Sequence, residues 1–143
     1  KETNSIIGTK EDDTIDGGKG SDTIRGGKGD DSLFGGKGSD ELCGGEGNDT
    51  LWGGAGNDWL EGGDGEDIFV YSDGTDKIFG YEQGLDKIMI LSDEQPQLNG
   101  TPLTNDVTFK VGKGKITVLD AANTTIHFID SKGKNLEPYV PSK

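Results

Sequence analysis

The sequence is poor in cysteine, histidine and apolar residues, and each shortage excludes a class of protein. With one cysteine, Cys43, the 143-residue chain has no intramolecular disulfide framework and no cysteine-based zinc site. Its single histidine, His127, excludes a site built from several histidines. Only 29% of the residues are hydrophobic, too few for a large conventional core. The apolar runs are far shorter than the ~18 residues that a membrane span needs, so no membrane span is expected.

Positive charge is also scarce. The chain has 14 Lys and Arg residues against 27 Asp and Glu residues, which gives a formal net charge of −13. Such acidity argues against nucleic acid and anionic membrane surfaces as partners, and it favours cations. Glycine, by contrast, is abundant, with 26 residues.

Most of the glycines belong to a repeat of nine residues. Six consecutive full copies read G-G-x-G-x-D-x-U-x, where U is apolar, and they begin at Gly17, Gly26, Gly35, Gly44, Gly53 and Gly62. Degenerate copies in the same register begin at Gly8 and Tyr71, so the repeat covers residues 8–79. These residues have a net charge of −12, whereas the rest of the chain has a net charge of −1. The repeat therefore contains nearly all of the acidity.

The period predicts a turn of six residues followed by a strand of three. Glycine at positions one, two and four allows positive φ or the close approach of another group. Position eight is apolar in every copy: Ile15, Ile24, Leu33, Leu42, Leu51, Leu60, Phe69 and Ile78. A strand that buries one side chain is not stable alone, so the copies are expected to stack into a coil. Helix is excluded, because each glycine in a helix costs about 1 kcal/mol relative to alanine.

Position six is aspartate in all eight copies: Asp13, Asp22, Asp31, Asp40, Asp49, Asp58, Asp67 and Asp76. In a stacked coil these carboxylates would lie about 4.8 Å apart in columns, where they repel one another unless a cation lies between them. Carboxylates and the carbonyls of glycine turns form an all-oxygen ligand set, which favours Ca²⁺ over Mg²⁺ and over soft metals. Roughly six Ca²⁺ ions would balance the charge of −12.

The repeat resembles the hemolysin-type, or RTX, calcium-binding nonapeptide of secreted bacterial proteins. The resemblance covers residues 8–79. It implies an all-β fold, a right-handed parallel β-roll in which two repeats make one turn. It also implies rows of Ca²⁺ along both edges of the roll, roughly five to six ions in all, each shared between one loop and the loop two copies later.

The resemblance also assigns the ligands. The paired aspartates would be Asp13 with Asp31, Asp22 with Asp40, Asp31 with Asp49, Asp40 with Asp58, Asp49 with Asp67, and Asp58 with Asp76. Backbone carbonyls of the loop glycines would complete the sites, and these are Gly17, Gly18, Gly20, Gly26, Gly27, Gly29, Gly35, Gly36, Gly38, Gly44, Gly45, Gly47, Gly53, Gly54, Gly56, Gly62, Gly63 and Gly65.

The regions outside the repeat lack its nine-residue period. Residues 1–7 are expected to be a lead-in, and residues 80–143 a small antiparallel β cap on the open end of the roll. Residues 92–106 are rich in proline, asparagine and glycine and predict a loop. Alternation predicts strands at residues 107–111, 115–119 and 125–128, with a hairpin turn at residues 112–114.

The leading hypothesis is a calcium-binding module that folds when it binds Ca²⁺, because low hydrophobicity and high charge would leave the free repeats disordered. The resemblance implies type I secretion of an unfolded chain from a bacterium and folding outside the cell. The chain is expected to be a fragment, joined to a neighbouring domain in a longer protein. No catalysis is expected, since the sequence shows no nucleophile–base set and no catalytic zinc site.

The alternative hypothesis concerns an apolar stripe. In a roll with two copies per turn, position nine points outward, and one sheet then presents Phe34, Trp52 and Val70 in a row. Either the C-terminal segment or a flanking domain covers this stripe, or the stripe is a partner surface. In the second case the chain would be an adhesin or ligand-binding module with Phe34 and Trp52 as its contacts.

Overall fold

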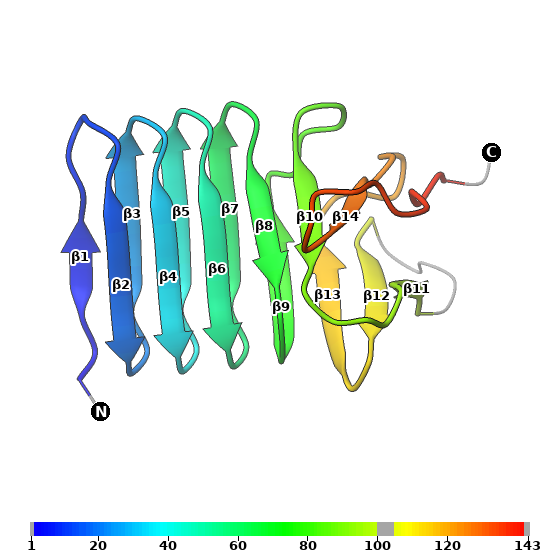
Figure 1. The fold of residues 1–143 in the computed structure, drawn as a ribbon, viewed down its shortest axis with the longest axis horizontal. Coiled ribbons are helices and arrows are strands. Elements are labelled where there is room, and N and C mark those ends of the chain that lie inside the picture. The colour runs from blue at the N-terminus through cyan, green and yellow to red at the C-terminus, as the bar shows by residue number, and fades with distance from the viewer. Residues whose placement is uncertain (1, 100–104, 142–143) are drawn as a thin grey trace.

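The computed structural model describes residues 2–99 and 105–141. Residues 1, 100–104 and 142–143, which belong to the expected lead-in, loop and C-terminal segment, lie outside the described residues. Every regular element in the described part is a β-strand. The strands stack into a flattened coil, with the N-terminus at one end and the C-terminus at the other (Figure 1). Within these residues no helix is long and apolar enough to cross a membrane.

The strands form two sheets. The first contains, in spatial order, β1 (Ser5–Ile7), β3 (Thr23–Lys28), β5 (Glu41–Glu46), β7 (Trp59–Asp64), β9 (Thr75–Phe79), β13 (Gly114–Val118), β12 (Val107–Val111) and β11 (Gln97–Leu98). The second contains β14 (Phe128–Asp130), β10 (Lys87–Ile90), β8 (Ile68–Tyr71), β6 (Thr50–Ala55), β4 (Ser32–Lys37) and β2 (Thr14–Lys19).

Pairing within the repeat is parallel and has a constant register. Each strand pairs with the strand two along the chain, and the paired residues are two nonapeptides apart, as in Thr23 with Glu41 and Leu33 with Leu51. Two copies therefore make one turn of the coil, which confirms the predicted parallel β-roll.

The division of each copy into turn and strand differs from the prediction. Strands such as β4 have six residues and include Gly35 and Gly36, so the turn shrinks to positions four to six. Parallel pairing continues through the second glycine, as in Gly36 with Gly54, and satisfies backbone groups that the period alone assigned to a turn. The position-one glycines, including Gly35, are not paired with a residue of the neighbouring strand.

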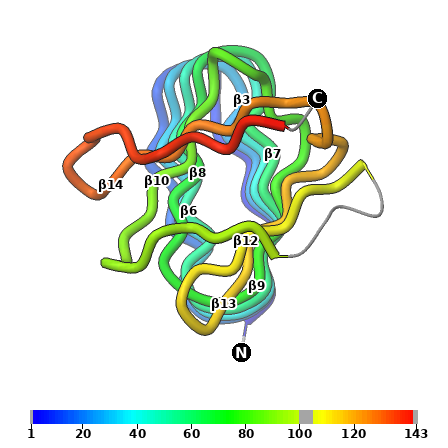
Figure 2. Tube along the Cα trace, turned by 90° about the vertical axis from the view of Figure 1, so that its right-hand side faces the viewer, coloured from blue at the N-terminus to red at the C-terminus, as the bar shows by residue number. Residues whose placement is uncertain are grey.

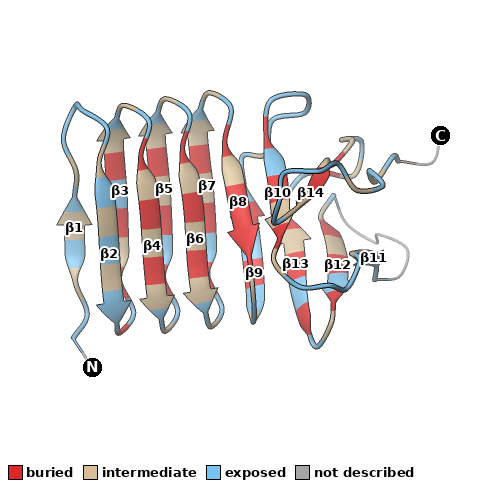
Figure 3. Ribbon diagram, viewed as in Figure 1, coloured by how far each residue is buried: buried red, intermediate tan, exposed pale blue. Residues whose placement is uncertain are grey.

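The core of the repeat is a single file of position-eight side chains. Leu33, Leu42 and Leu51 are each fully buried between the two sheets, and Figure 3 shows the buried positions recurring along the strands at the same level of the coil. One large apolar side chain buried per repeat strand explains how a chain with so few hydrophobic residues can fold.

The parallel ladder continues beyond residue 79. Strand β10 pairs in parallel with β8, β14 pairs in parallel with β10, and β13 pairs in parallel with β9. The hairpin of β12 and β13 is antiparallel. The first two expected strands are close to β12 and β13, but β14 begins only at Phe128, since Ile126 makes an isolated bridge with Tyr139 instead.

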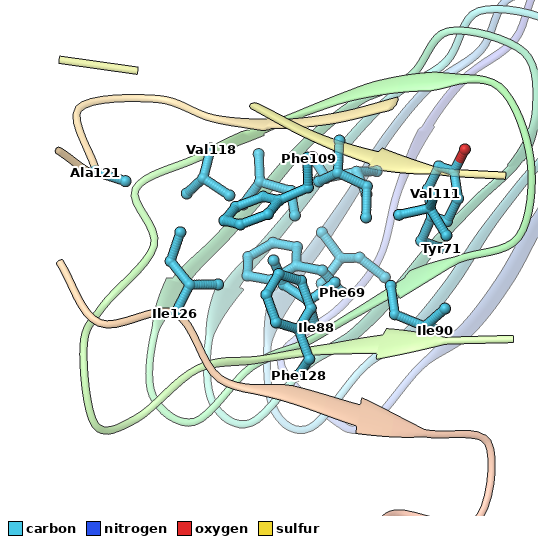
Figure 4. Close-up of a cluster of buried hydrophobic side chains, with 14 of the residues drawn as sticks. Phe69, Tyr71, Ile88, Ile90, Phe109, Val111, Val118, Ala121, Ile126 and Phe128 are labelled. Carbon is cyan, nitrogen blue, oxygen red and sulfur yellow. The ribbon is translucent and has the colours of Figure 1, made fainter. Parts of the chain in front are cut away.

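These C-terminal strands bring large apolar side chains to the end of the roll. Phe109 and Phe128 meet edge to face, with ring centroids 5.0 Å apart, and they belong to the same buried cluster as Phe69 of the repeat (Figure 4). Figure 2, which looks along the coil, shows β12 and β14 lying across its end. That residues 80–143 act as a cap stays a prediction.

Candidate metal centre

The position-six aspartates lie where each turn enters its strand, and nearly all are buried. Their exposed fractions are between 1% and 3%, for Asp22, Asp31, Asp40, Asp49, Asp58, Asp67 and Asp76. Asp13, in the degenerate first copy, is only partly buried. Buried carboxylates are costly unless they are paired or bound to a cation, so this column needs an explanation.

In every repeat aspartate except Asp13, one carboxylate oxygen accepts a backbone N–H from the previous turn of the roll. The backbone N–H of Asp22 donates to Oδ1 of Asp40 at 2.7 Å, and that of Asp40 donates to Oδ1 of Asp58 at 2.9 Å. The same bond joins Asp13 to Asp31, Asp31 to Asp49, Asp49 to Asp67, and Asp58 to Asp76. The structure thus brings together all six aspartate pairs that the resemblance implies.

The other oxygen has no partner in six of these aspartates. The unpartnered buried atoms are Oδ2 of Asp22, Asp31, Asp40, Asp49, Asp58 and Asp67. A buried carboxylate oxygen without a hydrogen bond costs about 1–3 kcal/mol or more. Six such atoms in regular array fit a hard cation at each.

A backbone carbonyl lies beside several of these unpartnered Oδ2 atoms, which we call open oxygens. A Cβ placed on Gly17 would lie 2.8 Å from Oδ2 of Asp22 and 2.8 Å from the carbonyl oxygen of Gly35. At Gly35 the corresponding atoms are Oδ2 of Asp40 at 2.5 Å and the carbonyl of Gly53 at 2.6 Å. Glycine at position one therefore leaves a space on which a carboxylate oxygen and the carbonyl of the next turn converge.

Desolvation disfavours the charged state of the column. Burial is the main cause that raises the pKa of Asp49 and of Asp58 to about 6, of Asp67 to about 7 and of Asp76 to about 8. Hydrogen bonds from the backbone partly oppose this, and neighbouring aspartates add to it. A bound cation would reverse the effect by stabilising the ionised forms.

No group of three or more His, Cys, Asp or Glu side chains suited to a metal occurs within residues 2–99 and 105–141. The pairs described above fit this, because each brings two carboxylates together and the other oxygens nearby are backbone carbonyls. That ligand set suits Ca²⁺, which accepts six to eight oxygens in flexible geometry.

The column is longer than the repeat predicted. The backbone N–H of Asn4 donates to Oδ1 of Asp22 at 2.7 Å, and that of Asp67 donates to Oδ1 of Asp86 at 3.0 Å. Asn4 lies nine residues before Asp13, with Ile6 at position eight. The D-K-I of residues 76–78 recurs at residues 86–88 after a one-residue insertion. These two signals were present in the sequence, but the missing glycines concealed them.

The apolar stripe is only partly as predicted. Phe34 and Trp52 are half-buried neighbours with ring centroids 5.9 Å apart. They line a surface hollow of about 300 Å³ together with Asp16, Ala55 and Ser72. Val70, the expected third member, is 5% exposed. Val70 stays in register with Trp52, but β10 extends the sheet beside it and pairs Met89 with Val70, so this end of the stripe is covered.

Comparison with known proteins agrees with this geometry. Residues 7–42 and 44–78 match the RTX calcium-binding nonapeptide repeat, in four copies. No curated protein matches the chain.

Several solved structures are similar. The extracellular lipase LipA from Serratia marcescens has a TM-score of 0.42 and 19% identity over 84% of this chain, which spans 38% of the lipase. The AlgE6R3 subunit of the Azotobacter vinelandii mannuronan C5-epimerase has a TM-score of 0.39 and 24% identity, over 83% of this chain and 79% of that one. The AlgE6R2 subunit of the same enzyme has a TM-score of 0.41 and 23% identity, with coverage of 79% and 82%.

The matched repeats lie in a parallel roll of stacked G-G-x-G-x-D loops. The chain therefore belongs to the RTX calcium-binding nonapeptide repeat family.

Proposed function

We propose that this chain is a calcium-dependent folding module of a secreted bacterial protein. The single observation that carries the proposal is the set of six buried, unpartnered Oδ2 atoms in the aspartate column. Aspartates of successive turns would hold each ion together with the carbonyls of the loop glycines.

Charge supports the same function. The −12 of residues 8–79 is gathered in turns that stack directly on one another, so the ionised column opposes its own folding. About six Ca²⁺ ions would neutralise it. Because the unfolded chain holds no preformed site, the binding free energy of the ions becomes free energy of folding.

Calcium-dependent folding also supports a location outside the cell. Proteins with RTX repeats are typically secreted by bacteria. In a cytosol poor in calcium the chain would stay unfolded and fit for secretion, and it would fold outside, where modules of this kind bind at roughly 10⁻⁴–10⁻³ M. The chain itself would be structural, and any catalytic activity would belong to a neighbouring domain of the parent protein.

The test is a calorimetric titration of the metal-stripped chain with CaCl₂ and, separately, with MgCl₂. We expect Ca²⁺ to bind with a stoichiometry of several ions per chain and Mg²⁺ to produce little heat, because Mg²⁺ keeps its own waters and demands octahedral geometry. A chain that binds neither ion, or both equally, contradicts the proposal.

A second candidate function is the binding of a neutral sugar in the hollow over Phe34 and Trp52. The indole N–H of Trp52 donates to Oγ of Ser72 at 3.1 Å and fixes the ring, while Asp16 adds acceptor oxygens at the rim. A flat apolar ring face beside hydroxyl and carboxylate groups suits a sugar ring.

Fluorescence of Trp52 in a Trp59→Phe background, titrated with a neutral hexose oligosaccharide, tests this candidate. A saturable change that Phe34→Ala abolishes would support it. An unchanged spectrum at millimolar sugar contradicts it.

A further inference from the structure

The aspartate column consists of two separate rows. Hydrogen bonds between successive turns join Asp13, Asp31, Asp49, Asp67 and Asp86 in one row. They join Asn4, Asp22, Asp40, Asp58 and Asp76 in the other. Each row has three open Oδ2 atoms, and in each row the open atoms belong to the interior members. The ends of the rows are different from the middle.

The two ends of the first row are closed in the same way. The backbone N–H of Thr9 donates to Oδ2 of Asp13 at 2.5 Å, and the Thr9 hydroxyl contacts the same oxygen at 2.9 Å. The backbone N–H of Glu82 donates to Oδ2 of Asp86 at 2.8 Å. In both loops the donor lies four residues before the aspartate, at position two of the loop. The oxygen that is open in the interior loops is here already satisfied.

Position two is glycine in all six open loops. These glycines have positive φ: Gly18 at 94°, Gly27 at 120°, Gly36 at 107°, Gly45 at 120°, Gly54 at 99° and Gly63 at 100°. Thr9 and Glu82, at the same position, do not have positive φ. Asp120 is the only non-glycine residue with positive φ in the described part of the chain. A residue with a Cβ disfavours the left-handed conformation, so its N–H stays directed at the carboxylate.

We propose that Thr9 and Glu82 are built-in terminators of this cation row, each using a backbone N–H in place of a cation on the last carboxylate. The inference rests on the proposed calcium function and adds to it the limits of the row. It assigns three cation positions to this row, at Asp31, Asp49 and Asp67, and it closes the position between Asp13 and Asp31 that the repeat alone would fill.

The other oxygens of that closed position are already in place. A Cβ on Gly8 would lie 2.6 Å from Oδ2 of Asp13 and in contact with the carbonyl oxygen of Gly26, as at the open loops. The N–H of Asp13 also donates to Oδ1 of Asp31 at 2.8 Å. The difference from an open loop is therefore confined to residues 9 and 11, where Thr and Glu replace two glycines.

Native mass spectrometry of the calcium-saturated chain tests the proposal. Thr9→Gly combined with Glu11→Gly gives residues 8–13 the same sequence as residues 26–31, and we expect one more Ca²⁺ per chain than in the unmodified protein. Glu11→Gly alone keeps the Thr9 N–H in place and should leave the ion count unchanged.

The reciprocal variant is Gly18→Thr, in a loop of the second row. Nothing lies within 4 Å of a Cβ built on Gly18, so only its φ of +94° opposes the change. We expect the N–H of residue 18 to donate to Oδ2 of Asp22, so that the chain binds one Ca²⁺ fewer.

Three outcomes overturn the inference. An unchanged count in the folded double variant does so, and so does an unchanged count in Gly18→Thr, which decides the matter if the double variant fails to fold. An unmodified chain that binds no Ca²⁺ refutes the proposed function itself, and the terminators with it.

Discussion

At the residue scale, six of the eight repeat aspartates divide their two oxygens between different tasks. Oδ1 accepts an N–H from the previous turn and fixes the stacking, as in Asp49 with Asp31. Oδ2 has no hydrogen-bond partner, which in the proposed function leaves it for a cation, and glycine at position one keeps the space around it clear. The motif therefore needs a carboxylate at position six, since an amide would offer only one oxygen.

Replacing one interior aspartate tests this division. Asp49→Asn should lower the thermal midpoint in Ca²⁺ and raise the calcium concentration needed for folding, because an amide nitrogen cannot bind the cation. Asp64→Asn makes the same change of charge at an exposed position-three residue and should have little effect. Equal effects in the two variants would show that charge alone matters.

The position-one glycines give a second prediction at this scale. In Gly35→Ala the new methyl group would collide with Oδ2 of Asp40 and the carbonyl of Gly53. We expect weaker calcium binding and a lower midpoint in thermal unfolding monitored by circular dichroism. Lys37→Ala, two residues further along at an exposed position, is the matched control. A Gly35→Ala chain as stable as that control would contradict the role of position-one glycine in keeping the space beside Oδ2 of Asp40 clear.

Single residues also show where sequence reasoning stops. The eight repeat aspartates and their glycines are readable from the period. Asn4 and Asp86 are not, because they belong to loops without paired glycines, and the second follows an insertion. The closure of Asp13 by Thr9 depends on a hydrogen bond that no spacing reveals.

At the scale of the strand, stability comes from one buried side chain and from backbone pairing. Leu42 is fully buried and packs between neighbours of the same kind in the file. Leu42→Ala should destabilise the calcium-bound roll by about 2–5 kcal/mol, the usual cost of such a cavity.

Chemical denaturation in excess Ca²⁺ measures this loss. Cys43→Ala, at the adjacent half-buried outward position, should cost much less. If Leu42→Ala is as stable as Cys43→Ala, the file of position-eight residues does not hold the roll together.

The strands also illustrate a limit of pattern reading. Alternation located β12 and nearly located β13, but the period assigned the glycine pair of each copy to a turn. Those glycines extend the strands because the next turn of the coil offers partners for their backbone groups. Such a partner exists only once the coil is assembled, so no local pattern contains it.

The buried aspartate column predicts that the folding stability of the metal-stripped chain depends on pH. Burial raises the pKa of Asp49 to about 6, of Asp67 to about 7 and of Asp76 to about 8 in the folded state, against an ordinary value of 3.8. The folded chain then binds more protons than the unfolded one over this range. Its stability is therefore greatest below the ordinary value and is lost as the pH rises through the raised values.

Far-UV circular dichroism of the stripped chain at about pH 4 and about pH 8 measures this dependence, with more β-structure expected in the more acidic sample. Asp76→Asn should reduce the difference, because it removes the carboxyl with the pKa of about 8. More β-structure at the higher pH would contradict the burial of the column.

At the scale of the whole molecule, the sequence predicted the fold of its repeat half far better than that of the remainder. A nine-residue period with one apolar position leaves few arrangements other than a stacked coil. Residues 80–143 have no period, and their positions follow from contacts such as that of Phe109 with Phe128. The parallel pairing of β13 with β9 and of β14 with β10 was not predicted, since it joins strands separated by long connections.

For the whole molecule, the central proposal is that this acidic, glycine-rich chain depends on Ca²⁺ for its fold. The most direct measurement is far-UV circular dichroism of the metal-stripped chain near neutral pH, titrated with CaCl₂ and in parallel with MgCl₂. We predict a disordered spectrum that becomes β-type cooperatively with Ca²⁺ and not with Mg²⁺. A chain already fully β-structured in chelator, and unchanged by Ca²⁺, would contradict the account.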